Sequence, residues 1–179
     1  MLAQLVPRNP GVFMALSAST TLPYPAAKVT ETFTDEAFLR HISELVGGSL
    51  ESVQRDGDVS GAFTLTVVRK VPSARLPEIA KKMLGDSLTV TQTERWQAPA
   101  ADGSRTADVT MKVAGAPVDV NAVQQLVADG GSTRVDLTGD VKSSIPFLGG
   151  KIAAAAEPML GKALNIQAQQ AEAWLSGRS

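Results

Sequence analysis

Gln92, Glu94 and Trp96 have the types and spacing to do chemistry in a protein interior, and they lie in "SLTVTQTERW", residues 87–96. Side chains alternate between the two faces of a β-strand, so these three share a face with Leu88 and Val90 and point with them toward the core. Burial raises the pKa of a carboxyl group, which prepares it to act as a general acid or base. In an apolar pocket, the carboxylate and the amide could instead hydrogen-bond a ligand and fix its orientation.

Other environments for Glu94 stay open at this point. Because Glu94 lies near the end of its strand, its side chain could reach water, pair with a nearby arginine, or be turned outward by a β-bulge. Trp96 would either line the mouth of a cavity or anchor the end of the sheet, and we favour the anchor.

The composition argues against several classes of site. The chain has no cysteine and a single histidine, His41, so disulfides, thiolate catalysis and multi-histidine metal sites are not expected. His41 falls on the helix face opposite Phe38, Ile42 and Leu45, where we expect it to be exposed to solvent. A net charge of −1 without a basic stripe argues against nucleic-acid binding. We therefore expect no metal, no cofactor and no nucleic-acid partner.

The chain length of 179 residues suits one domain with its own core, which we place at residues 14–179. Residues 1–13 contain two prolines and a glycine, and we expect them to form a flexible N-terminal extension. This segment lacks the charged and apolar regions of a secretion signal. No apolar run reaches the roughly 18 residues of a membrane span. We expect a cytoplasmic protein and make no prediction of its oligomeric state.

Apolar spacing and turn residues predict the elements that position these side chains. Residues 14–22 alternate as a first strand, and two helices follow over about 23–33 and 34–48. The second helix has Thr34 or Asp35 as its N-cap and ends at a double glycine. The Asp56-Gly57 pair then indicates a hairpin between two extended runs.

The second half of the chain adds a short helix, four strands and a long helix. The segment 72–85 contains two prolines and an amphipathic helix that carries Leu76, Ile79, Ala80, Met83 and Leu84. Four strands follow, separated by turns at 102–103, 115–117 and 129–131, which indicates an antiparallel meander. A helical pattern from about Gly150 to Ser176 ends the chain, with a kink or break expected at Pro158. Trp174 would pack this helix onto the first two.

These elements predict an α+β domain with a seven-stranded antiparallel sheet. The apolar face of such a sheet needs a cover, and the terminal helix, lying in the curl of the sheet, would supply it. The two early helices would close one end.

Four stretches resemble a known superfamily: "LPYPAAKV", "LPEIAKKMLG", "TQTERW" and "SIPFLGGKI", which together lie within residues 14–176. The chain resembles the START-like superfamily, and within it an actinobacterial family of unknown function. This resemblance implies the helix-grip fold, a curved seven-stranded sheet wrapped around a long C-terminal helix. It also implies a cavity between sheet and helix for lipids, sterols, polyketides or other hydrophobic molecules. It implies no single activity and no set of catalytic residues.

Strand alternation and the helical stripe predict the side chains that would line this cavity. We expect the ligand-binding residues to be Phe63, Leu65, Val67, Leu88, Val90, Gln92, Glu94, Trp96, Val109, Met111, Val135, Leu137, Ile152, Ala156, Met159, Leu160 and Ala163. The same faces also carry Ala107, Val113, Gly139, Val141 and Ile166.

The preferred interpretation is a carrier or sensor of a hydrophobic small molecule with no chemistry of its own. One alternative is an enzyme of the cyclase or hydrolase kind, with Glu94 as acid–base and Gln92 orienting the substrate. Another is a protein-interaction module whose cavity is filled. The segment 72–85 could act as a lid, and its Arg75, Lys81 and Lys82 could contact an acidic head group or, transiently, a membrane surface. The competing interpretation of this segment is a solvated connecting helix.

Overall fold

The structure of the protein, a computed structural model, has seven strands and four helices in the part of the chain that it describes. That part comprises residues 12–74, 76, 78–144, 147 and 149–177, and within these all side chains except 12–16, 79–80, 152–153 and 156–157. The strands are β1 (Val12–Leu22), β2 (Ser49–Gly57), β3 (Phe63–Pro72), β4 (Ser87–Trp96), β5 (Arg105–Val113), β6 (Val118–Asp129) and β7 (Ser132–Ser143). The helices are α1 (Ala26–Phe33), α2 (Glu36–Leu45), α3 (Glu78–Leu84) and α4 (Gly149–Ser176).

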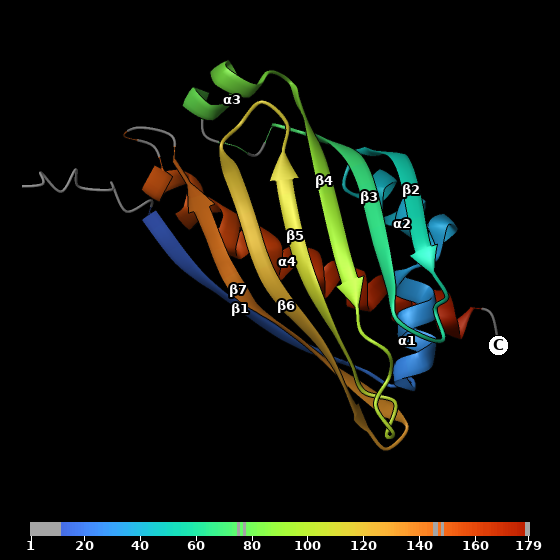
Figure 1. Cartoon of the computed structure of the whole chain (residues 1–179). Helices are drawn as coiled ribbons and strands as arrows, with labels where there is room; N and C mark the ends of the chain where they lie inside the picture. The colour runs from blue at the N-terminus through green and yellow to red at the C-terminus, as the bar shows by residue number, and fades with distance from the viewer. Residues whose placement is uncertain (1–11, 75, 77, 145–146, 148, 178–179) are drawn as a thin grey trace, which may run out of the picture.

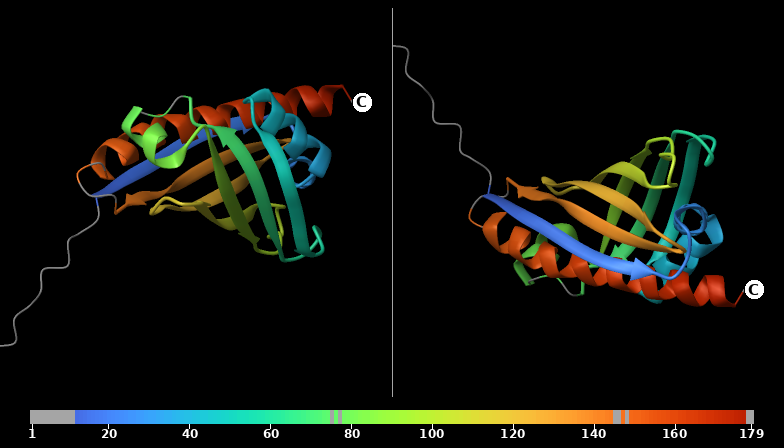
Figure 2. Two further views of the ribbon diagram at one scale, coloured as in Figure 1. Left: turned by 90° about the horizontal axis from the view of Figure 1, so that it is seen from above. Right: turned by 90° about the horizontal axis from the view of Figure 1, so that it is seen from below.

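All seven strands belong to one antiparallel sheet in the order β1-β7-β6-β5-β4-β3-β2. The sheet is strongly curved, and α4 runs along its concave side from the end near α3 to the end near α1 (Figure 1). The views from above and below show the sheet wrapping around this helix (Figure 2). The architecture is the helix-grip arrangement, so the predicted α+β fold class is confirmed.

Local sequence accounts for the ends of the first two helices. Pro25, in an extended conformation, is the N-cap of α1. Asp35 is the N-cap of α2, and its side chain accepts a hydrogen bond from the backbone N–H of Phe38 at 2.9 Å. Gly47 follows the end of α2 with φ at +81°, a conformation that glycine adopts without strain. The predicted start and stop of α2 are therefore confirmed, with Asp35 as the cap.

Three local features differ from the sequence-based expectations. The turn between β2 and β3 lies at 58–62 and not at Asp56-Gly57, because Gly57 still pairs with Phe63. β1 begins at Val12, which pairs with Ser143, two residues before the expected start of this strand. Of the kink or break expected at Pro158, the break is absent, because α4 continues through this residue.

Aromatic side chains fill the end of the fold near α1 and α2. The rings of Phe33 and Phe38 lie 6.5 Å apart, and Trp174 of α4 meets Phe38 edge-on at 5.6 Å. On the sheet, Phe63 stacks on Trp96 at 5.9 Å. Trp174 thus packs the last helix onto the early helices, as the sequence predicts, and this end of the concave face is a solid core.

The buried stripe of α4 differs in phase from the predicted one. Ala163 was expected to face the sheet but is exposed, whereas Leu164, Ala168 and Ala171 are buried. The helix carries alanine on several sides, so spacing alone does not fix which side is buried. Contact with β1 and β7 decides it.

His41 is half-buried, and the expectation that it would be exposed is wrong. Its Nε2 lies 2.9 Å from Oε1 of Gln170, and its ring is beside that of Trp174 at 5.8 Å. His41 follows Phe38 by three residues, so the two lie on the same side of α2, and Trp174 of α4 contacts both. Helical spacing therefore favoured burial of His41, and the expectation of an opposite face was mistaken.

Candidate ligand-binding pocket

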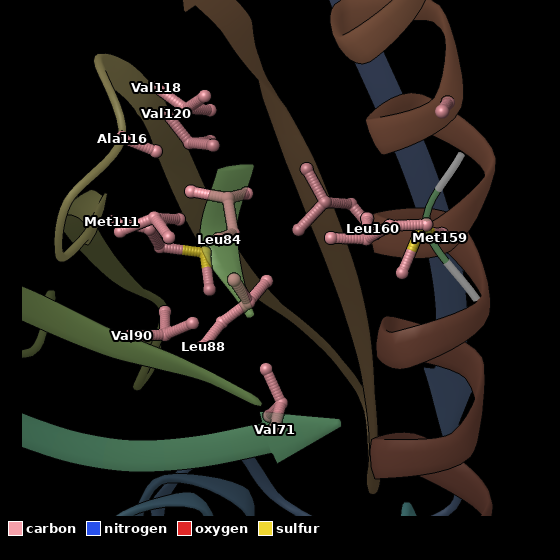
Figure 3. A pocket seen from close by; sticks show the side chains of 13 residues that line it. Val71, Leu84, Leu88, Val90, Met111, Ala116, Val118, Val120, Met159 and Leu160 are labelled. Atoms are coloured by element: carbon pink, nitrogen blue, oxygen red, sulfur yellow. The ribbon is translucent and has the colours of Figure 1, made fainter. Parts of the chain in front are cut away.

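An apolar pocket of about 190 Å³ lies at the other end of the concave face, between the sheet, α3 and the first half of α4. The close-up shows Met159 and Leu160 of α4 across the pocket from Leu84, Met111 and Val120 (Figure 3). All of the lining residues are apolar: Val71, Leu76, Leu84, Leu88, Val90, Met111, Val113, Ala116, Val118, Val120, Ala155, Met159 and Leu160.

Strand alternation places the sheet side of this lining. Val71 ends the inward face of β3, and its cross-strand partner is Leu88 of β4. Val90 is paired with Val113 of β5 in the same way. Leu84 closes the pocket from α3, and Met159 is 42% exposed although it lines the pocket. The pocket therefore reaches the surface beside α4.

Part of this lining was predicted from the sequence. The residues expected to bind a ligand that do lie at the pocket are Leu88, Val90, Met111, Met159 and Leu160, and Val113 from the same strand faces joins them. The segment 72–85 contributes Leu76 and Leu84, so it lies where a lid would lie. Met83, expected on the apolar side of its helix, is 57% exposed.

Most of the other expected residues face inward but lie in the packed core. Trp96 is 2% exposed and anchors the end of the sheet, which is the interpretation the sequence favoured. The rest of this group belongs to the same buried cluster or packs against it, and comprises Phe63, Leu65, Val67, Val109, Val135 and Leu137. The side chains of Ile152 and Ala156 lie outside the described residues.

Several lining residues were not expected from the sequence: Val71, Ala116, Val118, Val120 and Ala155. Leu76 and Leu84 were expected only on the possible lid and not among the ligand-binding residues. For Val71 the signal was present, because the alternation that places Leu65 and Val67 inward continues to positions 69 and 71. Ala116 lies in a turn. Turn residues do not alternate between two faces as strand residues do, so the orientation of Ala116 could not be predicted from spacing.

Glu94 points inward and is 5% exposed, but it does not line the pocket. Its Oε1 accepts a hydrogen bond from Nε2 of Gln92 at 2.5 Å, and its Oε2 accepts one from the indole N–H of Trp96 at 2.7 Å. Both carboxylate oxygens are therefore engaged by neighbours on β4.

Arg69 extends this network and was also missed. From the inward face of β3, its Nη1 donates to Oε1 of Gln92 at 3.0 Å, and its Nε donates to Oγ of Ser43 at 3.1 Å. Ser43 is buried on α2. The result is a chain of hydrogen bonds from α2 through β3 to the end of β4, which runs from Arg69 into the packed core at Glu94 and Trp96.

Burial dominates the electrostatics of this network. It raises the pKa of the Glu94 carboxyl group, while the hydrogen bonds from Trp96 and Gln92 and the charge of Arg69 act in the opposite direction. Burial likewise lowers the pKa of the Arg69 guanidinium, and the charge of Glu94 raises it. Gln92 lies between the two groups with its oxygen toward the cation and its N–H toward the carboxyl.

No helix in the described part of the chain is long and apolar enough to span a membrane. Among the same residues, no three His, Asp or Glu side chains gather in a way that could hold a metal ion.

Known structures show the same fold at low sequence identity. A protein from Thermus thermophilus, TTHA0849, matches with a TM-score of 0.60 at 14% identity, over 93% of this chain and 99% of that one. The Zhui aromatase/cyclase from Streptomyces sp. R1128 matches with a TM-score of 0.58 at 13% identity, over 93% and 96% of the two chains. Such likeness establishes the fold alone.

Sequence relatives place the chain more closely. The uncharacterized protein Rv0481c of Mycobacterium tuberculosis is 27% identical over 155 residues, which are 86% of this chain and 83% of the relative. Residues 17–175 match the family described as "Protein of unknown function (DUF2505)". Because this match extends over nearly the whole domain, the protein belongs to the DUF2505 family.

Proposed function

We propose that the protein binds a hydrophobic small molecule in the pocket between the sheet, α3 and α4, as a carrier or sensor within the START-like superfamily. The observation that carries the proposal is the pocket itself, a space of about 190 Å³ whose lining is entirely apolar. At the opposite end, side chains pack the concave face into a solid core, so the open space near α3 is a local feature of this fold.

The volume limits how much of the ligand is enclosed. An apolar cavity of about 150 Å³ in another protein remains dry and binds benzene. The pocket is somewhat larger, so it suits one ring with a substituent or a short alkyl chain, and longer ligands would extend past Met159 to the surface. Burying about 250 Å² of apolar surface contributes about 6 kcal/mol before the loss of ligand freedom is subtracted. Micromolar affinity or weaker is expected.

The proposal assigns no acid–base chemistry to Glu94. A general acid or base must come within hydrogen-bonding reach of its substrate. The two oxygens of Glu94 already accept hydrogen bonds from Gln92 and Trp96, and the residue lies outside the pocket lining. A cyclase or hydrolase mechanism through Glu94 would need this network to open first.

Native mass spectrometry of the protein purified from its own host, followed by solvent extraction, tests the proposal. Two alanines of α4 supply a matched pair of variants, because Ala155 lines the pocket and Ala163 is exposed. Ala155→Trp should fill the pocket and abolish an apolar adduct, whereas Ala163→Trp should retain it. An adduct that persists in Ala155→Trp, or toluene and 1-octanol that fail to bind the purified protein in solution, would contradict the proposal.

A further inference from the structure

Arg69 lies next to the pocket wall on β3, at the boundary with the packed core, although its side chain is not part of the pocket lining. On its own strand it lies two residues from Val71, and its cross-strand partner on β4 is Val90. Both of these neighbours line the pocket. Directly opposite residues of an antiparallel pair have Cβ atoms about 5 Å apart, so the base of the Arg69 side chain adjoins the pocket wall.

The guanidinium of Arg69 has unused hydrogen-bonding capacity. Its Nε and Nη1 are engaged by Ser43 and Gln92, but Nη2 has no hydrogen-bond partner among the residues that the structure describes. An arginine has five N–H donors, and two of them belong to Nη2. Nη2 is not among the fully buried polar atoms of the described residues that lack a partner, so it is open to water or to the head group of a ligand.

The charge of Arg69 also lacks a direct counterion. None of the ion pairs between described residues includes it, since Gln92 separates it from Glu94. A half-buried cation without an acidic contact is costly because it has lost part of its hydration. Burial raises the pKa of Glu94, which weakens that residue as a permanent counterion. An anion from outside the chain would satisfy both the charge and the free Nη2.

We propose that Arg69 anchors the anionic head group of an amphipathic ligand whose apolar part fills the pocket. The inference rests on the proposed function and adds the ligand class, a small singly charged acid such as a carboxylic acid with a short chain or one ring. Head groups of this class gain a charge-assisted hydrogen bond from Nη2, which is stronger than a bond between neutral groups.

The opposite orientation would leave the head group in water at the surface beside Met159. In that orientation the protein would not distinguish an acid from an alcohol of equal chain length, because the lining offers only apolar side chains. The two orientations therefore predict different selectivity, and octanoate and 1-octanol are suitable probes.

Isothermal titration of both probes should be carried out with the wild-type protein, Arg69→Met, Arg95→Met and Ala155→Trp. Arg95 is exposed on the convex face of β4, so Arg95→Met makes the same chemical change away from the pocket. We expect wild type and Arg95→Met to bind octanoate about tenfold more tightly than 1-octanol, a difference of about 1.4 kcal/mol. Arg69→Met should lose this preference while 1-octanol binding is unchanged, and Ala155→Trp should bind both probes poorly.

The results distinguish failure of the Arg69 proposal from failure of the proposed binding of hydrophobic molecules in the pocket. Equal affinity of the wild-type protein for the two probes, or an Arg69→Met variant that keeps its preference for octanoate, overturns the role of Arg69 and leaves the apolar pocket standing. Failure of both probes to bind wild type overturns the proposed function and the inference with it.

A second measurement needs no variant, in case Arg69→Met does not fold. The carboxyl carbon of ¹³C-labelled octanoate reports its own pKa when it is bound to the wild-type protein. Contact with Arg69 should lower that pKa below the value of free octanoate, because a neighbouring cation favours the charged form. A raised pKa would indicate an apolar environment for the head group and would overturn the proposal.

Discussion

At the scale of the residue, the buried carboxyl group of Glu94 is held by hydrogen bonds from its neighbours on β4. Two N–H donors, from Gln92 and Trp96, point at its two oxygens. An amide in its place could accept through one oxygen only, and Gln92 cannot turn over to compensate because its own oxygen faces Arg69. The Glu94→Gln variant should therefore leave one buried donor unpaired, at a cost of about 1–3 kcal/mol.

The stability of the protein should depend on pH through Glu94. Its pKa is raised in the folded state from the ordinary value of 4.5, so above this pH the native state binds more protons than the unfolded state. The free energy of unfolding should therefore fall as pH rises from about 4.5 to the folded pKa. Glu94→Gln lacks this titration, so the deficit of the variant should shrink across the same window.

Urea unfolding of wild type and variant at several pH values between about 4.5 and 8 measures this dependence. Glu44→Gln, the same change on an exposed side chain of α2, is the control and should follow wild type. A constant difference between wild type and Glu94→Gln at all pH values would show that Glu94 does not titrate in the window.

Arg105, at the start of β5, connects this strand to the loop between β2 and β3 and to the residue after β4. It donates hydrogen bonds to the backbone carbonyls of Val59, Gly61 and Gln97, and its guanidinium lies 5.2 Å from the ring centroid of Phe63. Arg105→Met should lower the free energy of unfolding by about 3 kcal/mol, because charge-assisted hydrogen bonds to several backbone carbonyls are lost. Urea unfolding checks this, with Arg95→Met as the exposed control expected within about 0.5 kcal/mol of wild type.

At the scale of the element, α4 contains a proline, Pro158, which is unfavourable inside a helix. Pro158 has no N–H, so the carbonyl of Ala154 loses the donor that an α-helix would supply. The side chain of Pro158 is exposed, so no packing depends on it. The helix nevertheless continues through this position.

Replacing the proline should stabilise the protein. Pro158→Ala restores a helical hydrogen bond without removing a buried contact, and we expect the free energy of unfolding to rise by about 1–3 kcal/mol. Thermal unfolding followed by circular dichroism measures the change, and Lys162→Ala, exposed on the same helix, is the control. A loss of stability would mean that the local shape of α4 at Pro158 is needed for its packing on the sheet.

The whole molecule has two unlike ends. Near α1 and α2, side chains from both helices, α4 and the sheet fill the concave face, with Leu65 and Val67 fully buried. Near α3, the same face encloses a pocket whose lining is partly exposed. The packed end should therefore contribute most of the stability, and the end with the pocket should contribute less.

Two leucine-to-alanine variants, one at each end, test whether the two ends contribute differently to stability. Leu65→Ala removes a fully buried side chain from the packed end and should cost about 3–5 kcal/mol, because it creates a cavity in a dense core. Leu88→Ala removes the same atoms from the pocket wall, where the side chain is only half-buried, and should cost less than half as much. Similar losses in urea unfolding would show that both ends are packed alike.

Much of this fold could be predicted from local sequence, for identifiable reasons. The Asp35 cap and Gly47 delimit α2, and period-two alternation in β4 places Glu94 inside. The hairpin turn after β2 was predicted at Asp56-Gly57, because this dipeptide is common in turns. In the structure both residues still pair with β3, and the turn follows them. The candidate site was predicted only in part, since Arg69 and Val71 needed the alternation to be followed to the end of β3.

The sequence alone determined which strand side chains face inward, because alternation is a property of each strand by itself. Only the tertiary structure decided where the inward face is solid and where it is hollow. That depends on the side from which α4 is buried, as the exposed Ala163 and the buried Leu164 show. An alanine-rich helix can bury more than one side, so contact with the sheet, and not periodicity, selects the side and leaves the pocket beside α3.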